Sequence, residues 1–145
     1  LNALLTGSFA EKPQNESQAT YCRKLTKEDG LIDFRVPAQC LVHRIQAFRS
    51  WPGVSFRFKD LRIKVGKSSV ADLSLLPGEV SCDGSGNFSI GTGRDALVVH
   101  ELQKPGEKML ATQDFLRGFV IPDGTILESE FMPDLLVSGK SNSKA

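Results

Sequence analysis

The sequence of 145 residues lacks the features by which several protein classes are recognised. No apolar run approaches the roughly 20 residues that span a bilayer, which predicts that the protein has no membrane segment. Residues 1–11 lack the basic start of a secretion signal, so we expect a cytoplasmic protein. The three cysteines, Cys22, Cys40 and Cys82, are too few and too widely spaced for a disulfide framework. We expect them to be reduced thiols in the core.

Side chains that commonly carry chemistry are also few. The two histidines, His43 and His100, form no HxH or HExxH arrangement, and we interpret them as structural, with no metal site. Residues 91–96 (GTGRDA) fit a loose dinucleotide-binding pattern, but an apolar segment follows where that motif requires a helix. We interpret these residues as a hairpin turn. No nucleophile and base stand at a recognisable spacing, so the sequence predicts no catalytic residue.

The length and composition suit one domain. Hydrophobic residues make up 40% of the chain, enough for a core that needs neither disulfides nor metal. The chain begins with Leu rather than Met, which predicts a piece of a longer protein. We expect residues 1–22 to be the end of a preceding domain and a linker, because 11–20 (EKPQNESQAT) hold no large apolar side chain. Residues 23–137 then form the folded domain, and 138–145 a disordered tail.

Two periodicities divide this domain. Leu41, Ile45 and Phe48 recur at helical spacing and predict a helix over 37–48, which residues 50–53 (SWPG) end. Apolar and polar residues then alternate, predicting strands over 54–58 and 61–65 with a turn at Lys59 and Asp60. Further strands are expected at 21–25, 78–82, 87–91, 96–102 and 125–127, with a short helix at 111–117 and the end of a helix at 2–7. The fold class is mainly β with one or two helices, a small antiparallel barrel after an N-terminal linker.

The net charge of +1 conceals a division between the two halves. Residues 1–67 contain 12 Lys and Arg against 6 Asp and Glu, whereas residues 68–145 contain 6 against 11. Such asymmetry indicates either a polyanion-binding surface or an ordinary solvated basic face.

Seven cations lie between residues 44 and 67, with Asp60 as the one acidic residue among them. Arg57 and Lys59 are two apart and should share one strand face, and Arg62 and Lys64 should do the same on the partner strand. Like charges placed opposite each other cost stability, so we expect this ladder to bind an anion. Trp51 is interpreted either as a packing anchor, which we favour, or as a surface for stacking on a base.

The order of several segments resembles the C-terminal region of the methionyl-tRNA formyltransferase family. The blocks are QNESQATY at 14–21, RKLTKEDGLID at 23–33, AFRSWPG at 47–53, KVGK at 64–67, PG at 77–78 and QDFLRG at 113–118. The chain departs from the family at Gln46, Ser50, Gly66 and Glu107, where arginine, proline, tryptophan and a basic residue are common. These changes lower the number of cations and the stacking surface.

The resemblance implies an OB-fold-like barrel that holds initiator methionyl-tRNA. A separate N-terminal Rossmann-like domain, absent here, would transfer the formyl group of 10-formyltetrahydrofolate to the methionyl amine for translation initiation. This chain would then be a monomeric, catalytically inactive tRNA-binding domain with no cofactor of its own. We expect the tRNA contacts to come from Arg44, Arg49, Trp51, Arg57, Lys59, Arg62, Lys64 and Lys67.

Two alternatives remain open. Some sugar-nucleotide formyltransferases have related C-terminal regions, in which case the basic face would pack on the catalytic domain or on a second subunit. A free-standing OB-type binder of single strands would need aromatic side chains on the sheet surface. Phe56 and Phe58 alternate with the cations and are expected to face the core, which argues against the second alternative.

Overall fold

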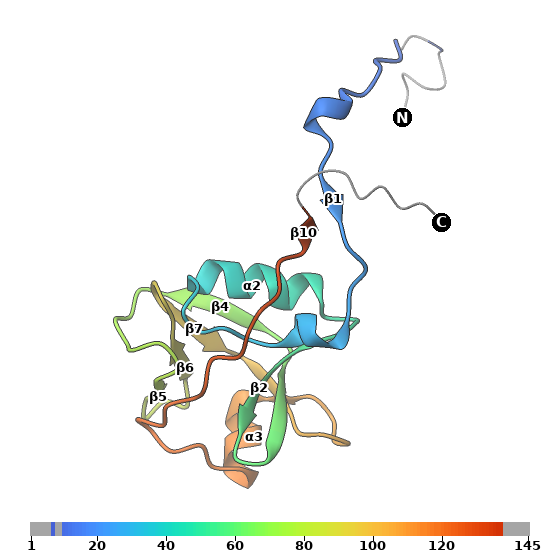
Figure 1. The fold of residues 1–145 in the computed structure, drawn as a ribbon. Coiled ribbons are helices and arrows are strands. Elements are labelled where there is room, and N and C mark those ends of the chain that lie inside the picture. The colour runs from blue at the N-terminus through green and yellow to red at the C-terminus, as the bar shows by residue number, and fades with distance from the viewer. Residues whose placement is uncertain (1–6, 8–9, 138–145) are drawn as a thin grey trace. The chain divides into compact units, whose positions relative to one another are not determined.

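A computed structural model describes residue 7 and residues 10–137 (Figure 1). These fall into two units, one formed by Leu25–Pro133 and the other by Leu1–Lys24 with Asp134–Ala145. In the second unit, β1 (Tyr21–Cys22) pairs antiparallel with β10 (Leu136–Val137). The predicted linker contains one short 3-10 helix, η1 (Glu16–Gln18). The predicted helix end at 2–7, apart from Gly7, and the predicted tail at 138–145 lie outside the described residues.

The larger unit is built from two antiparallel sheets, which confirms a mainly β fold with two helices. One sheet has the order β2-β3-β8-β9 and the other β4-β7-β6-β5. The elements are η2 (Lys27–Gly30), α2 (Ala38–Ala47), β2 (Val54–Phe58), β3 (Leu61–Val65), β4 (Ser68–Ala71), β5 (Val80–Cys82), β6 (Phe88–Gly91), β7 (Ala96–Val99), β8 (Glu101–Gln103), β9 (Leu110–Ala111) and α3 (Thr112–Gly118).

The two sheets meet at a corner where the chain passes from one to the other. β3 continues into β4 and β7 into β8, and hydrogen bonds bridge the corner, from Gly66 N to Glu101 O at 2.9 Å and from His100 N to Lys67 O at 2.8 Å. The strand predicted at 96–102 is therefore two strands in different sheets, and β4 was not predicted. In the described part of the chain the sheets do not close into the predicted barrel.

The β2–β3 hairpin has the bounds that the alternation predicts. Three of its inward side chains, Val54, Phe56 and Ile63, are buried at 1% exposure or less, whereas Leu61, at the end of the hairpin, is 37% exposed. Lys59 does not continue the strand, because it lies in the turn with a φ of 53°, a left-handed value. The prediction that Lys59 shares a strand face with Arg57 is therefore wrong.

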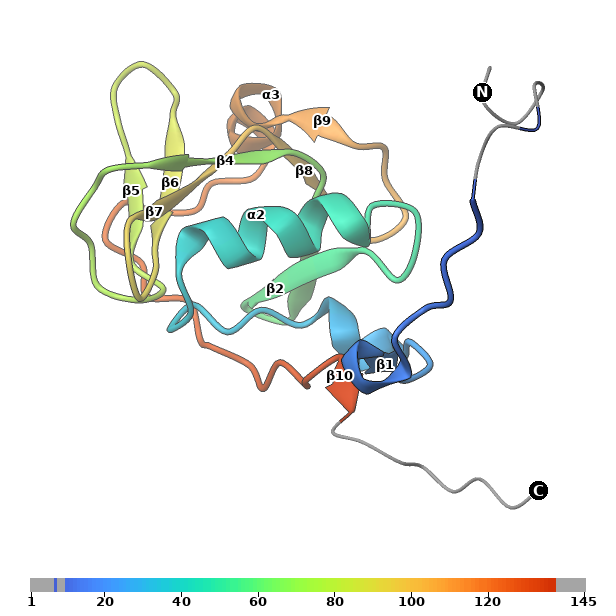
Figure 2. The same cartoon turned by 90° about the horizontal axis from the view of Figure 1, so that it is seen from above.

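Helix α2 covers the second sheet along β4 and β7 (Figure 2). Leu41, Ile45 and Phe48 are all buried, as their helical spacing predicts. The helix stops at Ala47, and Phe48 N donates to Arg44 O at 3.0 Å as the last bond of the helix. The neighbouring turn is held by a hydrogen bond from Gly53 N to Phe48 O at 2.8 Å.

Of the remaining predicted elements, the strands at 78–82 and 87–91 and the helix at 111–117 are confirmed within two residues as β5, β6 and α3. The segment 125–127 makes a single bridge, between Glu79 and Ile126, rather than a strand. Residues 91–96 form the turn between β6 and β7, as interpreted. No helix in the described ranges is long and apolar enough to cross a bilayer.

The cysteines are free, but they are not core residues. Cys22 and Cys40 are exposed, and Cys82 is half-buried on β5. Burial raises the pKa of the Cys82 thiol, and the nearby carboxylates of Asp123 and Asp83 raise it further. A raised pKa keeps this thiol protonated and chemically quiet. Among residues 7 and 10–137, no cluster of three His, Cys, Asp or Glu side chains could hold a metal ion.

Candidate nucleic-acid interface

The outer face of the β2–β3 hairpin carries a row of polar and cationic side chains. Arg57 lies opposite Arg62 in the register, and Ser55 lies opposite Lys64. The row continues across β8, where Gln103 is the partner of Lys64. The inward neighbours of these residues are core side chains, so the sheet alternation turns the cations toward solvent. The predicted facing of Arg57, Arg62 and Lys64 is thus confirmed.

Three of the predicted site cations have exposed side chains and no carboxylate partner. These are Arg57, Lys59 and Lys64, and none of them forms an ion pair within the described residues. The Lys59 ammonium group lies 5.3 Å from the centroid of the Phe58 ring. Their charges are available to an external anion.

Three other predicted cations are exposed but share acidic partners. Arg62 makes a two-pronged contact with Glu130, with both nitrogen–oxygen distances at 3.0 Å. Arg49 and Lys67 both lie 3.9 Å from the Glu101 carboxylate. Glu130 relieves the repulsion between Arg62 and Arg57 that the register creates. These acidic partners come from distant parts of the sequence, so local spacing gave no sign of them.

Arg44 does not lie on the exposed surface. Its side chain is only 10% exposed and lies 3.6 Å from the buried Asp29 carboxylate. It also donates to Asp29 O at 2.9 Å and to Pro133 O at 3.3 Å, and it covers the Phe48 ring. Arg44 is three residues after Leu41 and four before Phe48, so on the helix it lies next to these buried apolar side chains. We therefore leave Arg44 out of the interface.

Trp51 is 52% exposed, which does not fit the packing role that we favoured from the sequence. It lies in the turn between α2 and β2, beside Arg49, whose side chain is 61% exposed. The resemblance implies an aromatic side chain where Gly66 stands, and a Cβ built at Gly66 would lie 2.7 Å from Glu101 Oε2 and 2.8 Å from Met109 Sδ. Glu101 and Met109 thus fill the space beside this glycine.

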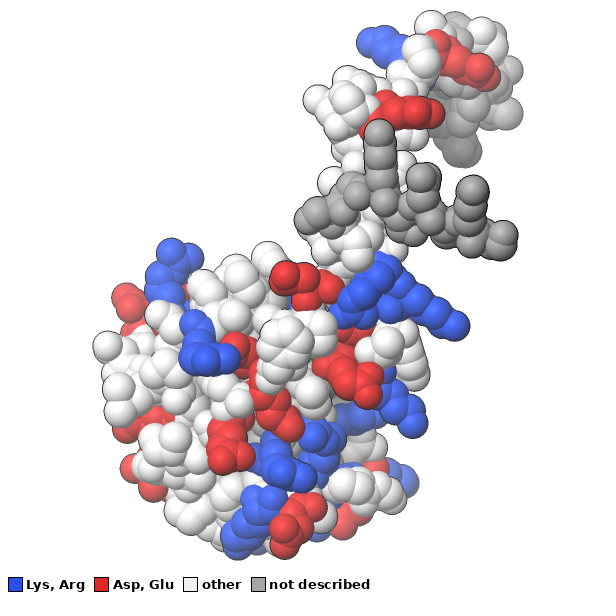
Figure 3. Space-filling view, viewed as in Figure 1, with Lys and Arg blue, Asp and Glu red and all other residues white. Residues whose placement is uncertain are grey.

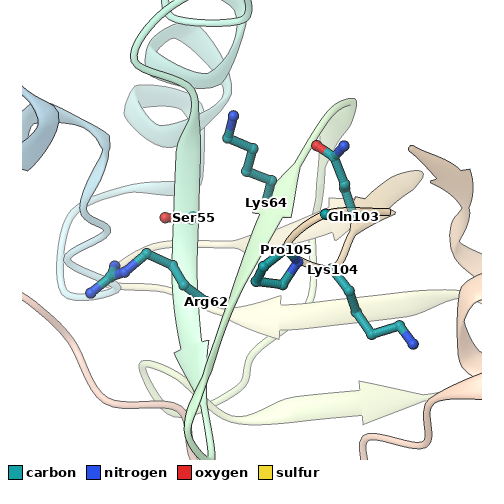
Figure 4. A pocket seen from close by; sticks show the side chains of 7 residues that line it. Ser55, Arg62, Lys64, Gln103, Lys104 and Pro105 are labelled. Carbon is teal, nitrogen blue, oxygen red and sulfur yellow. The ribbon is translucent and has the colours of Figure 1, made fainter. Parts of the chain in front are cut away.

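A hollow of about 350 Å³ lies between the hairpin and the β8–β9 connection (Figure 4). Arg62, Lys64 and Lys104 line it and leave the backbone in different directions, so their charges surround the hollow rather than converge in it (Figure 4). This arrangement suits an extended polyanion better than one small anion. The remaining lining residues are Ser55, Gln103, Pro105 and Gly106.

The basic and acidic residues that the sequence separates into two halves lie side by side on the folded surface. In Figure 3, Lys and Arg side chains gather over the region of the β2–β3 hairpin, with acidic side chains between them. Gln103 and Lys104 add polar groups to this surface from β8 and the turn after it. Neither was predicted as a site residue, because only the pairing of β8 with β3 brings them there.

Comparison with known proteins identifies the family. Residues 24–120 match the model of the formyl transferase C-terminal domain. A methionyl-tRNA formyltransferase from Trichlorobacter lovleyi is 32% identical over 127 residues, covering 88% of this chain and 40% of that protein. Another, from Paramagnetospirillum magneticum, is 38% identical over 118 residues, covering 81% of this chain and 38% of that protein.

A solved structure shares the fold. HypX from Aquifex aeolicus, crystallised with tetrahydrofolic acid, superposes with a TM-score of 0.58 at 20% identity, covering 84% of this chain and 22% of HypX. This chain spans about two fifths of the length of the methionyl-tRNA formyltransferases that it matches. The match over residues 24–120 includes both four-stranded sheets and both helices of the larger unit. The chain belongs to the formyl transferase C-terminal domain family.

Proposed function

We propose that this chain is the tRNA-binding domain of a methionyl-tRNA formyltransferase. Its family and the names of its relatives support this assignment. The whole enzyme would transfer a formyl group from 10-formyltetrahydrofolate to the methionyl amine of initiator tRNA in the cytoplasm. A separate catalytic domain would bind the folate and carry out the transfer. This chain would supply affinity and orientation.

The exposed cations of the hairpin would contact tRNA phosphates. Phosphate contacts position a nucleic acid without reading its sequence. Holding the tRNA at fixed points would place its aminoacylated end near the catalytic domain, so that binding meets part of the entropy cost of the reaction. The cations that the structure leaves for this role are Arg49, Arg57, Lys59, Arg62, Lys64 and Lys67.

The observation that carries the proposal is the opposition of Arg57 and Arg62 across the hairpin. Two like charges directly opposite each other destabilise a sheet. Glu130 pairs with Arg62, whereas Arg57, Lys59 and Lys64 have no carboxylate partner among the described residues. A polyanion bound along this face would neutralise all of them, and a nucleic-acid backbone provides such a row of charges.

A binding assay with matched variants tests the proposal. We expect Arg57→Ala combined with Lys64→Ala to weaken the binding of initiator tRNA at least tenfold, measured by gel shift or anisotropy. The control combines Arg94→Gln with Arg117→Gln, which removes the same charge from two arginines that are 75% and 77% exposed and paired with acidic neighbours. That control should bind tRNA like the parent protein.

Three results would contradict this proposal or the contacts that it assigns. Equal weakening by both double variants would mean that binding follows net charge and not the hairpin. The absence of tRNA binding by the unaltered chain would favour the sugar-nucleotide formyltransferase alternative, in which the basic face contacts another protein surface. Weakening confined to initiator tRNA would point to base recognition instead of phosphate contacts.

A further inference from the structure

The turn that carries Trp51 is held firmly although its aromatic side chain is exposed. Gly53 N donates to Phe48 O at 2.8 Å, which closes the turn against the end of α2. On another side the turn lies against Gly30, where an added Cβ would overlap the carbonyl oxygen of Gly53. The Lys64 side chain packs against the same glycine, since a Cβ built on Gly53 would lie 2.8 Å from Lys64 Cε. The backbone around Trp51 is thus fixed from three directions.

An indole held on such a rigid turn is a preformed binding surface for a ligand. A rigid turn leaves little conformational entropy to lose when a ligand covers the ring. The Trp51 ring is 52% exposed, so much of its apolar surface remains in water in the free protein. A ligand that covers this surface would remove it from water and so end its unfavourable hydration.

The cationic side chains beside Trp51 indicate which chemical class of ligand fits this surface. Arg49, with a 61% exposed side chain, is two residues away, and the Lys64 ammonium group lies over the Gly53 end of the turn. Lys64 also lines the hollow at the hairpin, so it connects the turn to the cationic face. A flat ring joined to a phosphate matches this combination of an exposed aromatic surface and neighbouring cations.

We propose that Trp51 stacks on an unpaired nucleobase of the bound RNA while Lys64 contacts a neighbouring phosphate. This inference rests on the proposed function and adds a base contact to a surface otherwise described by phosphate contacts. The base must be unpaired or terminal, because a base inside a duplex already has neighbours on both of its faces. Stacking accepts every base, so Trp51 selects single-stranded or end structure rather than a sequence.

The sequence provides a direct probe, because Trp51 is its one tryptophan. Fluorescence excited at a wavelength that tryptophan absorbs and Tyr21 does not therefore reports on this turn alone. The chain is titrated with initiator tRNA, with a short single-stranded RNA, with a duplex RNA whose two strands are joined at each end by a non-nucleotide linker, and with inorganic polyphosphate. Anisotropy of labelled tRNA, with the same ligands as competitors, measures binding independently of the tryptophan.

The expected result is that tRNA and the single strand quench Trp51 fluorescence, whereas polyphosphate competes with tRNA without quenching. The closed stem should quench less than the single strand when compared at equal occupancy. If labelled tRNA binds and Trp51 fluorescence does not change, the stacking inference is wrong and the proposed function stands. If no RNA binds by anisotropy, both the proposed function and the inference fail.

Variants test the same point through affinity. We expect Trp51→Ala to weaken single-strand binding about 5- to 100-fold, the range measured for one stacked base, and Trp51→Phe to lose less. Phe131→Ala is the matched control, because Phe131 is 76% exposed and lies beside Glu130 rather than beside free cations. Equal losses for Trp51→Ala and Phe131→Ala would overturn the inference.

Discussion

The β2–β3 hairpin and the β5–β6 hairpin have similar inner faces and different outer faces. Val80, Phe88 and Ile90 are buried to 1% exposure or less, as are Val54, Phe56 and Ile63 in the other hairpin. On the other face, Ser81 lies opposite Ser89, which is only 5% exposed, in one hairpin, whereas the exposed Arg57 lies opposite the exposed Arg62 in the other.

The comparison distinguishes the side chains that hold the sheets together from the side chains on the other face of each sheet. The inner alternation of apolar side chains fixes pairing and register in both hairpins. The outer positions are then open to selection for another purpose, and two opposed arginines do not stabilise a hairpin. The cationic face is therefore better explained by a ligand than by folding.

The largest expected effect concerns the inner faces, which should be equivalent. Phe56→Ala and Phe88→Ala each remove a ring that is at most 1% exposed. We expect each to lower the free energy of unfolding by about 3–5 kcal/mol, measured by urea denaturation. A loss below about 1 kcal/mol in one of the two would show that the inner faces do not contribute alike.

The next effect compares how much the buried Arg44 and the exposed Arg49 contribute to stability. Arg44→Met removes the guanidinium group that lies 3.6 Å from the carboxylate of Asp29, a residue that is 0% exposed. We expect a loss of about 3 kcal/mol in the free energy of unfolding, because a buried carboxylate loses a charged contact. Arg49→Met is the control, since its side chain is 61% exposed, and it should change stability little. Similar losses in both would contradict the assignment of Arg44 to the interior.

A smaller effect is expected at Glu130, which comes from the acidic half of the sequence and pairs with Arg62 on the cationic face of the hairpin. Glu130→Gln frees Arg62 and restores the repulsion between Arg62 and Arg57. We expect stability to fall by up to about 1 kcal/mol and tRNA affinity to rise severalfold, measured by denaturation and by anisotropy. The exposed Glu128, changed to Gln, controls for the loss of one negative charge. Tighter binding by both variants alike would mean that Arg62 is not the cation released.

The smallest effect makes one outer face resemble the other. Arg57→Thr replaces the unpaired arginine by a short polar residue that suits a strand. We expect stability to rise by about 0.2–1 kcal/mol while tRNA binding weakens. A variant that is both less stable and fully active in binding would show that Arg57 serves the fold rather than a ligand.

The sequence predicts secondary structure best where the pattern that indicates an element lies in consecutive residues. The strands at 54–58 and 61–65 were predicted to the residue because five or more apolar and polar residues alternate without interruption. β4 was missed because Ser68 and Ser69 interrupt the alternation, and its residues are all half-buried. The break at His100 was missed because hydrogen bonds to Lys67 and Thr112, distant in sequence, turn the chain there.

The candidate site was predicted less well than the fold. Spacing placed Arg57, Arg62 and Lys64 on one face, since strand alternation depends only on neighbours. It could not show that Arg44 meets Asp29, or that Glu130 and Glu101 reach three of the cations, because tertiary packing brings them together. The exposure of Trp51 depends equally on the turn at Gly53, which packs against Gly30 from a distant part of the sequence.

The salt dependence of tRNA binding tests the central claim most directly. If the outer face contacts about five phosphates, the logarithm of the association constant should fall with the logarithm of salt concentration at a slope of about −4 to −5. The Arg57→Ala, Lys64→Ala double variant should then show a slope smaller by about two. A slope near zero for the unaltered chain, or equal slopes for the two proteins, would contradict a function based on phosphate contacts at this hairpin.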